Sequence, residues 1–381
     1  MMNLQQNIYF RSPAVPDLVL RSAEIGDDAQ LLEVIKEVMP SNRMSLSFER
    51  VNSYLSASTI LGHTRQCLVI VKETRPDQIL GMFLLAWKQC GTAPQHYALC
   101  YICDLRFRKE LRGKRNVRLI MDYLAATFPQ HNFYQSIILA DNVLARKVFH
   151  VTREHYFSPY IWDNIYTYNI SHFKAIDLPH YLNVVPLEEG HIDAVLEFLA
   201  DLQQYYNFLT IYDFKNIHTD QKFWQGLSYN DFYIVVDESN QIVGLYGLWD
   251  QKHIKRIRVL DYHYPLKLVK PLYNLYATLC GKMTLPKVRQ CFEYLLMQGP
   301  FCSPHRADVF EFMLHHAMQS AKAQNHQILS LSLAENDPRR YVMEQATAEI
   351  IHAIHSLHSF QADPTQYFDR QKISYIDVAR I

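Results

Sequence analysis

The feature that most constrains this chain is a strand, a basic turn and an amphipathic helix that follow one another near residue 110. Residues 101–107 form an apolar run that predicts a buried strand. A basic turn around Gly113 follows, and the next apolar residues recur at spacings of three and four: Val117, Ile120, Met121, Leu124 and Phe128. This spacing predicts a helix with one core-facing stripe. Backbone N–H groups and the helix dipole favour an anion at such a turn, so we expect a phosphorylated cofactor.

The turn resembles the acetyl-CoA signature of the GNAT superfamily of N-acyltransferases, in which an apolar strand residue precedes Arg-Gly-Lys-Gly-Ile-Gly. Phe107 stands at the apolar position. The resemblance implies that the pyrophosphate of acetyl-CoA, or of another acyl-CoA, lies against the turn residues Arg112, Gly113, Lys114, Arg115, Asn116 and Val117. Arg115 and Val117 replace residues that are usually glycine, which hinders close approach of the backbone. Arg115 either pairs with a phosphate oxygen or is solvated at a helix start that has lost its cofactor.

Length and charge set broad bounds on the class of protein. A chain of 381 residues suggests two domains. Lys+Arg and Asp+Glu both number 38, so overall charge gives no reason to expect a nucleic acid or membrane partner. Seven cysteines without a disulfide-like framework fit a reducing compartment. The N-terminus lacks an apolar signal region and no apolar run could span a bilayer, so we expect a cytoplasmic protein.

The same order of predicted strands and helices occurs in both halves of the chain. In the first half we expect strands at 18–23, 67–71, 79–85, 101–107, 136–139 and 155–170, and helices at 28–39, 48–54, 112–128 and from 142. In the second half we expect strands at 183–187, 232–236, 242–247, 292–297 and 328–331, and helices at 192–202, 307–321 and near 337. The segments 79–81 and 242–244 occupy equivalent places, which indicates duplication.

This order is that of the GNAT fold, and the whole chain resembles a group of tandem GNAT proteins. Asp104-Leu105-Arg106 and the segment 248–251, Leu-Trp-Asp-Gln, carry the closer resemblance. The implied fold class is α/β (α+β), with two GNAT-like domains at 1–175 and 180–381. Each domain would hold a mixed, mostly antiparallel sheet flanked by helices. The resemblance implies a fold and a cofactor class, and it leaves the substrate open.

The resemblance also implies roles for residues beside the turn. The backbone of Leu105, Arg106 and Phe107 would hold the pantetheine arm of CoA, and Asn142 would contact the later part of the arm. Phe149 stands where the family usually has a tyrosine that protonates the departing thiolate. Phenylalanine cannot donate this proton, so the donor is Tyr134, Tyr156 or water, or the first half binds CoA without an acid.

Asp104 is the carboxylate nearest the expected opening of the strand, and it is our candidate catalytic base. The alternative is an end-of-strand residue paired with Arg106 or Arg108. Many enzymes of the superfamily use a chain of waters as the base, so activity does not depend on this choice.

The second half lacks a comparable turn. Its segment 298–306 has no basic glycine-rich run, and Pro300 and Pro304 remove N–H donors that a phosphate would use. We interpret this half as a degenerate copy. It would shape the acceptor cleft, pack on the first half, or form a homodimer.

Three further patterns carry less weight. Cys100 and Cys103 have metal-like spacing, but on a strand they face opposite sides, and the same holds for histidines 352, 355 and 358. We expect no metal. The basic, apolar run 252–270 could lie on a membrane or RNA, line a site for an acidic acceptor, or, as we favour, cover a sheet with its apolar side.

The resemblance implies an N-acyltransferase that moves an acetyl or other acyl group from CoA to a primary amine, on a small molecule or a peptide. The alternative is an inactive protein, either a CoA-binding sensor or an interaction scaffold.

Overall fold

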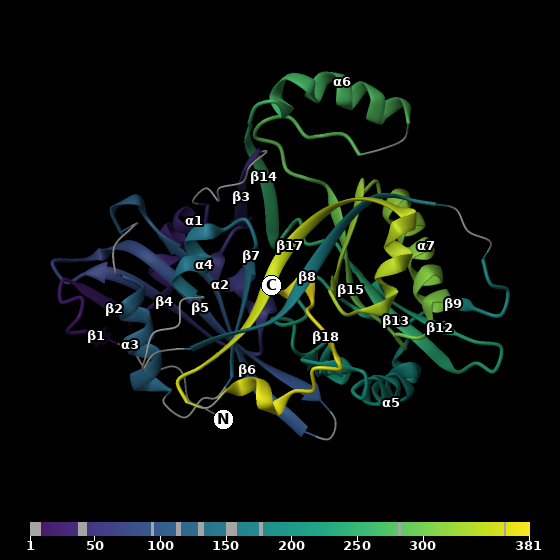
Figure 1. Ribbon diagram of the computed structural model, residues 1–381, viewed down its shortest axis with the longest axis horizontal. Helices are drawn as coiled ribbons and strands as arrows, with labels where there is room; N and C mark the ends of the chain where they lie inside the picture. Colours follow the sequence, from purple (N-terminus) through teal and green to yellow (C-terminus); the bar gives the residue numbers. More distant parts are fainter. Residues whose placement is uncertain are drawn as a thin grey trace.

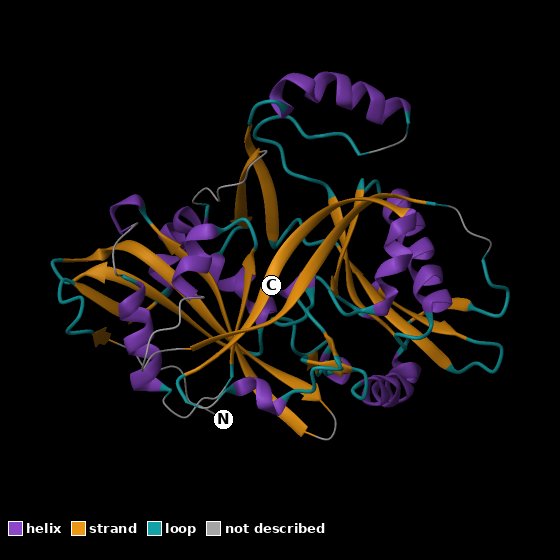
Figure 2. Ribbon diagram, in the orientation of Figure 1, coloured by secondary structure: helices purple, strands orange, loops and turns teal. Residues whose placement is uncertain are grey.

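The computed structural model describes residues 9–36, 44–92, 95–111, 116–128, 133–149, 158–174, 178–280, 283–361 and 363–381. Strands run through the whole molecule, and helices pack on each half of the sheet (Figure 2). The first half contains β1 (Tyr9–Arg11), β2 (Leu18–Ser22), α1 (Asp28–Ile35), β3 (Met44–Arg50), α2 (Tyr54–Ala57), β4 (Thr64–Lys72), β5 (Arg75–Thr92), β6 (Gln95–Phe107), α3 (Val117–Thr127), β7 (Tyr134–Leu139), α4 (Val143–Phe149) and β8 (Ser158–Phe173).

The second half follows a similar order, with β14 and α6 added between its hairpin and β15. It contains β9 (Asn183–Pro186), α5 (Ile192–Leu202), β10 (Tyr206–Asn207), β11 (Leu209–Thr210), β12 (Phe232–Val236), β13 (Ile242–Trp249), β14 (Lys255–Tyr262), α6 (Leu266–Leu279), β15 (Tyr294–Cys302), α7 (Ala307–Ala323), β16 (Ile328–Ala334), β17 (Ala346–Ser359) and β18 (Ile373–Ser374). The predicted strand 232–236 and helix 192–202 are confirmed to the residue.

The two halves share one large sheet because each contributes a long strand to the junction. Within the described residues the strand order is β1-β2-β4-β5-β6-β7-β17-β8-β16-β15-β13-β12-β9. β17 comes from the second half, yet it pairs with β7 and β8 of the first. β8 in turn pairs with β16 of the second half. The last strand of each half is therefore exchanged, and Figure 1 shows β8 and β17 crossing the centre of the molecule.

The duplication is visible in the register of the hairpin strands. In the first half Gly81 pairs with Phe107, Met82 with Arg106 and Leu84 with Cys103. In the second half the matching pairs are Gly244–Cys302, Leu245–Phe301 and Gly247–Gln298. The same irregularity falls at the same place in both halves. The register therefore aligns the two copies residue by residue, with Asp104 matching Gly299 and Leu105 matching Pro300.

One predicted helix is wrong. Residues 48–50 are the end of the strand β3, residues 51–53 connect it to the next element, and Tyr54 begins the short helix α2. β3 pairs antiparallel with β14 of the second half, with Arg50 opposite Lys255. The strand forms because a partner strand far along the chain satisfies its backbone, which local propensity does not report.

Our preferred interpretation of the basic run 252–270 is also wrong. The run forms β14 and the start of α6, and α6 stands away from the rest of the molecule at the end of the β3–β14 ribbon (Figure 1). Among the residues of α6 only Ala277 is buried. The part of the run in α6 therefore does not cover a sheet, whereas Ile254, Val259 and Tyr262 of the same run are buried.

Candidate functional site

The strands β6 and β7 separate from one another along part of their length. They pair in parallel only at Cys100–Tyr134 and Tyr101–Gln135. β6 continues to Phe107 against β5, whereas β7 continues against β17. In the described part of the chain, residues 102–107 therefore have a strand on one side only. Backbone groups along such an edge can hydrogen-bond an extended ligand.

A bulge lies within this open edge. Asp104 and Leu105 together oppose a single residue of β5, Phe83, because the register shifts between Met82 and Leu84. Asp104 has φ +50°, a left-handed conformation that is uncommon for residues other than glycine. Bulges of this kind break the strand ladder and re-aim backbone groups. The bulge therefore leaves backbone groups of 104–105 out of regular pairing with β5.

The carboxylate of Asp104 is held by the first half of the chain. Its Oδ2 accepts hydrogen bonds from Arg50 Nη2 and from the Tyr54 hydroxyl, both at 3.0 Å. Burial alone would raise the pKa of Asp104, but the Arg50 and Arg106 cations and these hydrogen bonds outweigh it and lower the pKa. Asp104 is thus a stabilised anion and a weak base. The sequence pattern offered Arg106 or Arg108 as the partner of Asp104, whereas the cation that hydrogen-bonds Asp104 is Arg50.

The structure describes only two of the six residues of the predicted phosphate turn. Arg112, Gly113, Lys114 and Arg115 lie outside the described residues. Asn116 is buried, and its side-chain Nδ2 donates to the backbone oxygen of Leu111 at 2.6 Å. Val117 is the first residue of α3 and packs against the core of the first half. The Asn116 side chain therefore links the start of α3 to Leu111, the last described residue before the turn.

The predicted pantetheine residues lie on the open part of β6. Leu105 and Phe107 are half-buried and pack against the same core, which holds the strand in place. Arg106 donates from Nη1 to the backbone oxygen of Leu105 at 3.0 Å. Their side chains are anchored in the first half, while the strand edge remains open on the β7 side.

The second wall of the opening is β7 with the helix α4 that follows it. Asn142 caps α4, since its Oδ1 accepts from the backbone N–H of Ala145 at 3.1 Å. Phe149 is the last residue of α4, and its side chain lies outside the described part. The hydroxyl of Tyr134 is buried and contacts the Phe128 carbonyl at 3.5 Å, and burial raises its pKa. A buried, hydrogen-bonded phenol is poorly placed to protonate a thiolate. Tyr156 lies outside the described residues.

In the second half the equivalent opening is filled by the chain itself. β15 and β16 pair only over residues 294–296 and 328–330 and then separate. The short helix at Val378–Arg380 lies against both strands. The carbonyl of Pro300 accepts from Arg339 Nη1 at 2.9 Å, and Gly299 has φ +56°. The bulge is preserved here, but side chains of the protein occupy the gap.

The buried Arg380 joins the two halves at this point. Its Nη1 donates to the carbonyls of Ile60 and Phe223, at 2.9 and 2.7 Å, and its guanidinium lies 3.8 Å from the centre of the Phe223 ring. Lys88 donates to the Arg380 carbonyl at 3.0 Å. The segment is therefore a fixed part of the core.

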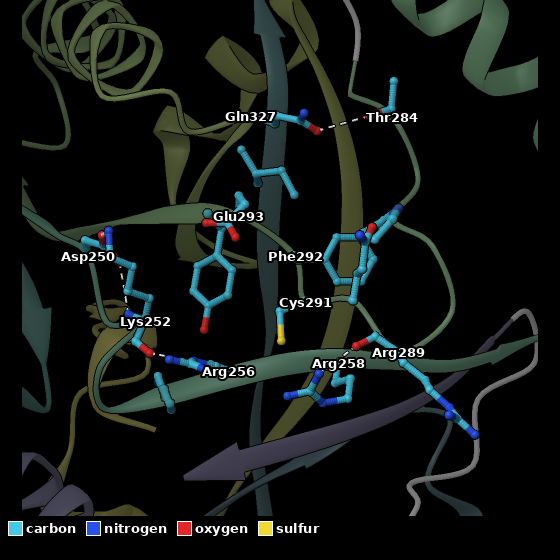
Figure 3. Close-up of a pocket in the computed structure, with 15 residues that line it drawn as sticks. Asp250, Lys252, Arg256, Arg258, Thr284, Arg289, Cys291, Phe292, Glu293 and Gln327 are labelled. Atoms are coloured by element: carbon cyan, nitrogen blue, oxygen red, sulfur yellow. Dashed lines mark hydrogen bonds and ion pairs between the residues drawn. The ribbon is translucent and has the colours of Figure 1, made fainter. Parts of the chain in front are cut away.

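A cavity of about 600 Å³ opens beside β14 (Figure 3). Five cations line it against two carboxylates, Asp250 and Glu293; the cations are Lys252, Lys255, Arg256, Arg258 and Arg289. Arg258 is paired with Glu49 and Lys252 with Asp250. Burial and the neighbouring Arg50 cation lower the pKa of Lys255 to about 7. Because Lys255 pairs in register with Arg50, this cationic cavity adjoins the residues that hold Asp104.

The cysteines and histidines with metal-like spacing do not form a metal site in the described residues. No group of three or more His, Cys, Asp or Glu side chains is placed to hold a metal in the described segments. Cys100 is buried, and Cys103 contacts the carbonyl of Leu84. His355 and His358 are buried and hydrogen-bonded to Gln135 and Ser136 of β7. The histidines thus help to join β17 to β7.

Sequence patterns did not identify the two residues that hydrogen-bond Asp104. Arg50 and Tyr54 lie in the segment predicted as a helix, although Met44, Leu46 and Phe48 alternate with polar residues in the period of a strand. Read as a strand, that alternation would have placed Arg50 at a strand end. No pattern identifies Asp104 as its partner, because the two residues meet only through the tertiary fold.

A separated, bulged parallel strand pair with a helix after each strand, present twice in one chain, is the tandem GNAT fold. Comparison with solved structures finds the same architecture at low sequence identity. A Saccharomyces cerevisiae N-myristoyltransferase with bound myristoyl-CoA matches with a TM-score of 0.60 and 9% identity, over 94% of this chain and 86% of that one. A second structure of that enzyme gives 0.59 and 10%, over 94% and 82%. A probable N-acyltransferase from Enterococcus faecalis V583 gives 0.48 and 7%, over 91% and 74%.

The two likenesses to the N-myristoyltransferase structures establish the fold. No protein-family model matches the sequence, and no curated protein matches it.

Proposed function

We propose that this protein is an acyl-CoA-dependent N-acyltransferase that transfers an acyl group to a primary amine. The observation that carries the proposal is the contrast between the two strand openings. The first has an open bulged edge on β6, whereas Arg339 and the segment 378–380 fill the second. We therefore assign the acyl-CoA to the first half and the boundary between the halves to residues 175–180.

The cofactor would extend from the turn into the opening. The turn 112–115 and the backbone of Asn116 and Val117 would hold the pyrophosphate through N–H groups at the start of α3. The edge of Leu105–Phe107 would hydrogen-bond the pantetheine arm as an added strand does. Asn142 uses its Oδ1 to cap α4, so only its amide NH₂ is left for the arm.

In the proposed reaction the amine nitrogen attacks the thioester carbonyl. A C–N bond forms, the C–S bond breaks, the nitrogen loses one proton and the thiolate of CoA gains one. Asp104 is a weak base because Arg50 holds it as an anion, so we assign it to positioning the bulge. We assign the proton transfers to water, with Tyr156 as the side chain to test. The acceptor would reach the carbonyl from the cationic cavity beside β14.

The assay measures thiol release from acetyl-, octanoyl- and myristoyl-CoA with a panel of primary amines and peptides, and identifies the product by mass spectrometry. We expect amine-dependent release with at least one acyl-CoA. Lys114→Ala/Arg115→Ala should reduce kcat/KM at least about 100-fold, because two charge-assisted contacts of about 1.5 to 3 kcal/mol each are lost. If the protein binds the cofactor but releases no thiol from any of the acyl-CoA compounds, the proposed enzyme activity is contradicted.

That last result would support the second candidate function, a CoA-binding sensor. Phe149 at the end of α4 and the buried Tyr134 hydroxyl favour it, since neither supplies a proton to a thiolate. All seven cysteines are free, and we place either function in the cytoplasm.

A further inference from the structure

The helix α6 is amphipathic with its apolar side turned outward. Its stripe recurs at helical spacing and is exposed along its length: Leu268, Val269, Leu272, Leu275, Tyr276 and Leu279. Leu272 is 71% exposed and Leu279 79% exposed. A surface helix of a globular protein normally turns such a stripe toward the core. Large exposed apolar patches mark interaction sites.

The inward side of α6 is fixed by polar contacts. Asn274 exchanges two hydrogen bonds of 2.9 Å with the backbone of Leu285, and the Tyr273 hydroxyl donates to the Met283 carbonyl at 3.2 Å. Ala277 is buried on the same side. These contacts set the rotation of the helix about its axis. The outward direction of the stripe is therefore built into the fold.

The surroundings of the stripe are cationic. Residues 262–292 contain no Asp or Glu and five Lys or Arg: Lys267, Lys270, Lys282, Lys287 and Arg289. Lys267 is paired with Asp261, just before this segment, and Lys270 lies 4.9 Å from the centre of the Tyr262 ring. Two copies packed stripe to stripe would bring like charges together. The charge therefore favours an anionic partner over a second copy of the chain.

We propose that α6 docks this protein on an anionic lipid membrane, with its apolar stripe in the interface and the lysines at the headgroups. Helices with an apolar face and flanking Lys or Arg bind membranes in this way. At 14 residues α6 is too short to cross a bilayer, and no helix in the described segments is long and apolar enough to do so. The exposed Tyr264 before the helix suits the interfacial region. This inference departs from the expectation of no membrane partner that overall charge supported.

The test is co-sedimentation of the full chain with phosphatidylcholine vesicles, with and without phosphatidylserine. We expect binding to the serine-containing vesicles that falls at least tenfold in Leu272→Glu/Leu275→Glu. The matched control, Leu178→Glu/Ile350→Glu, adds the same charge at exposed apolar positions elsewhere and should bind like the wild type. Lys267→Gln/Lys270→Gln should weaken binding and reduce its dependence on salt.

The alternative occupant of the stripe is a second copy of the chain. Light scattering without vesicles tests for it by measuring the mass of the protein in solution. A dimer that becomes monomeric in Leu272→Glu/Leu275→Glu, with no vesicle binding by the wild type, would show that a second copy covers the stripe and would overturn the proposal. Equal binding to both vesicle types, or none to either by the folded protein, would also overturn it.

Discussion

Asp104→Asn should lower the free energy of unfolding by about 3 to 5 kcal/mol, the usual cost of removing one partner from a buried ion pair. Asparagine keeps the shape of the side chain and tolerates a left-handed backbone, so the change isolates the charge. Arg50 would be left as an enclosed cation whose Nε already lacks a hydrogen-bond partner. Urea unfolding measures the effect. Arg50→Met combined with Asp104→Asn should recover at least half of the loss.

The pH dependence checks the same ion pair. The pKa of Asp104 is lowered in the folded protein. The ion pair therefore stabilises the fold fully above the unfolded pKa of about 3.9, and this stabilisation is lost as pH falls toward the folded pKa. The difference in unfolding free energy between wild type and Asp104→Asn should stay constant from about pH 7 to 5 and shrink below about pH 4. A difference that stays constant down to pH 3 would show that the charge of Asp104 is not the source.

The second large effect is expected at Arg380. Arg380→Ala removes a buried guanidinium that donates to Ile60 and Phe223, and it leaves the Asp377 carboxylate, 3.7 Å away, without this cation. We expect a loss of about 3 to 5 kcal/mol in unfolding free energy. Because Ile60 and Phe223 belong to different halves, the two halves should become less cooperative in unfolding.

An exposed arginine serves as the control. Arg289→Ala removes an exposed side chain that lines the cationic cavity, so its effect on stability should stay within about 0.5 kcal/mol. If Arg380→Ala proves equally mild, the segment 378–380 does not hold the second opening closed.

Much of the fold could be predicted because its signals are local. The helix stripe of 307–321 and the hairpin 232–247 follow from hydrophobic period and turn residues, and both form as expected. The exchange of β8 and β17 was not predicted, and β17 itself was not among the predicted strands of the second half. Strand exchange depends on which partner is available in space, and sequence period carries no such information.

In the candidate site, too, the local elements could be predicted and the contacts between distant segments could not. The predicted strand 101–107 forms the end of β6, and the helical stripe after the turn forms α3, which begins at Val117 rather than at 112. The cation that holds Asp104 was missed because it arrives on β3, a strand stabilised by β14 from the other half. The helix α6 was not among the predicted helices, and period alone would not have told which of its sides faces the core.

The central claim is that the first half alone binds acyl-CoA, and calorimetric titration of acetyl-CoA and myristoyl-CoA tests it directly. We predict one site per chain in the wild type, at least about 100-fold weaker in Lys114→Ala/Arg115→Ala, since two charge-assisted phosphate contacts are lost. Arg339→Gln, in the filled opening, should leave the number of sites unchanged. Two sites per chain, unaltered binding in the turn variant, or no binding by the folded wild type would contradict the account.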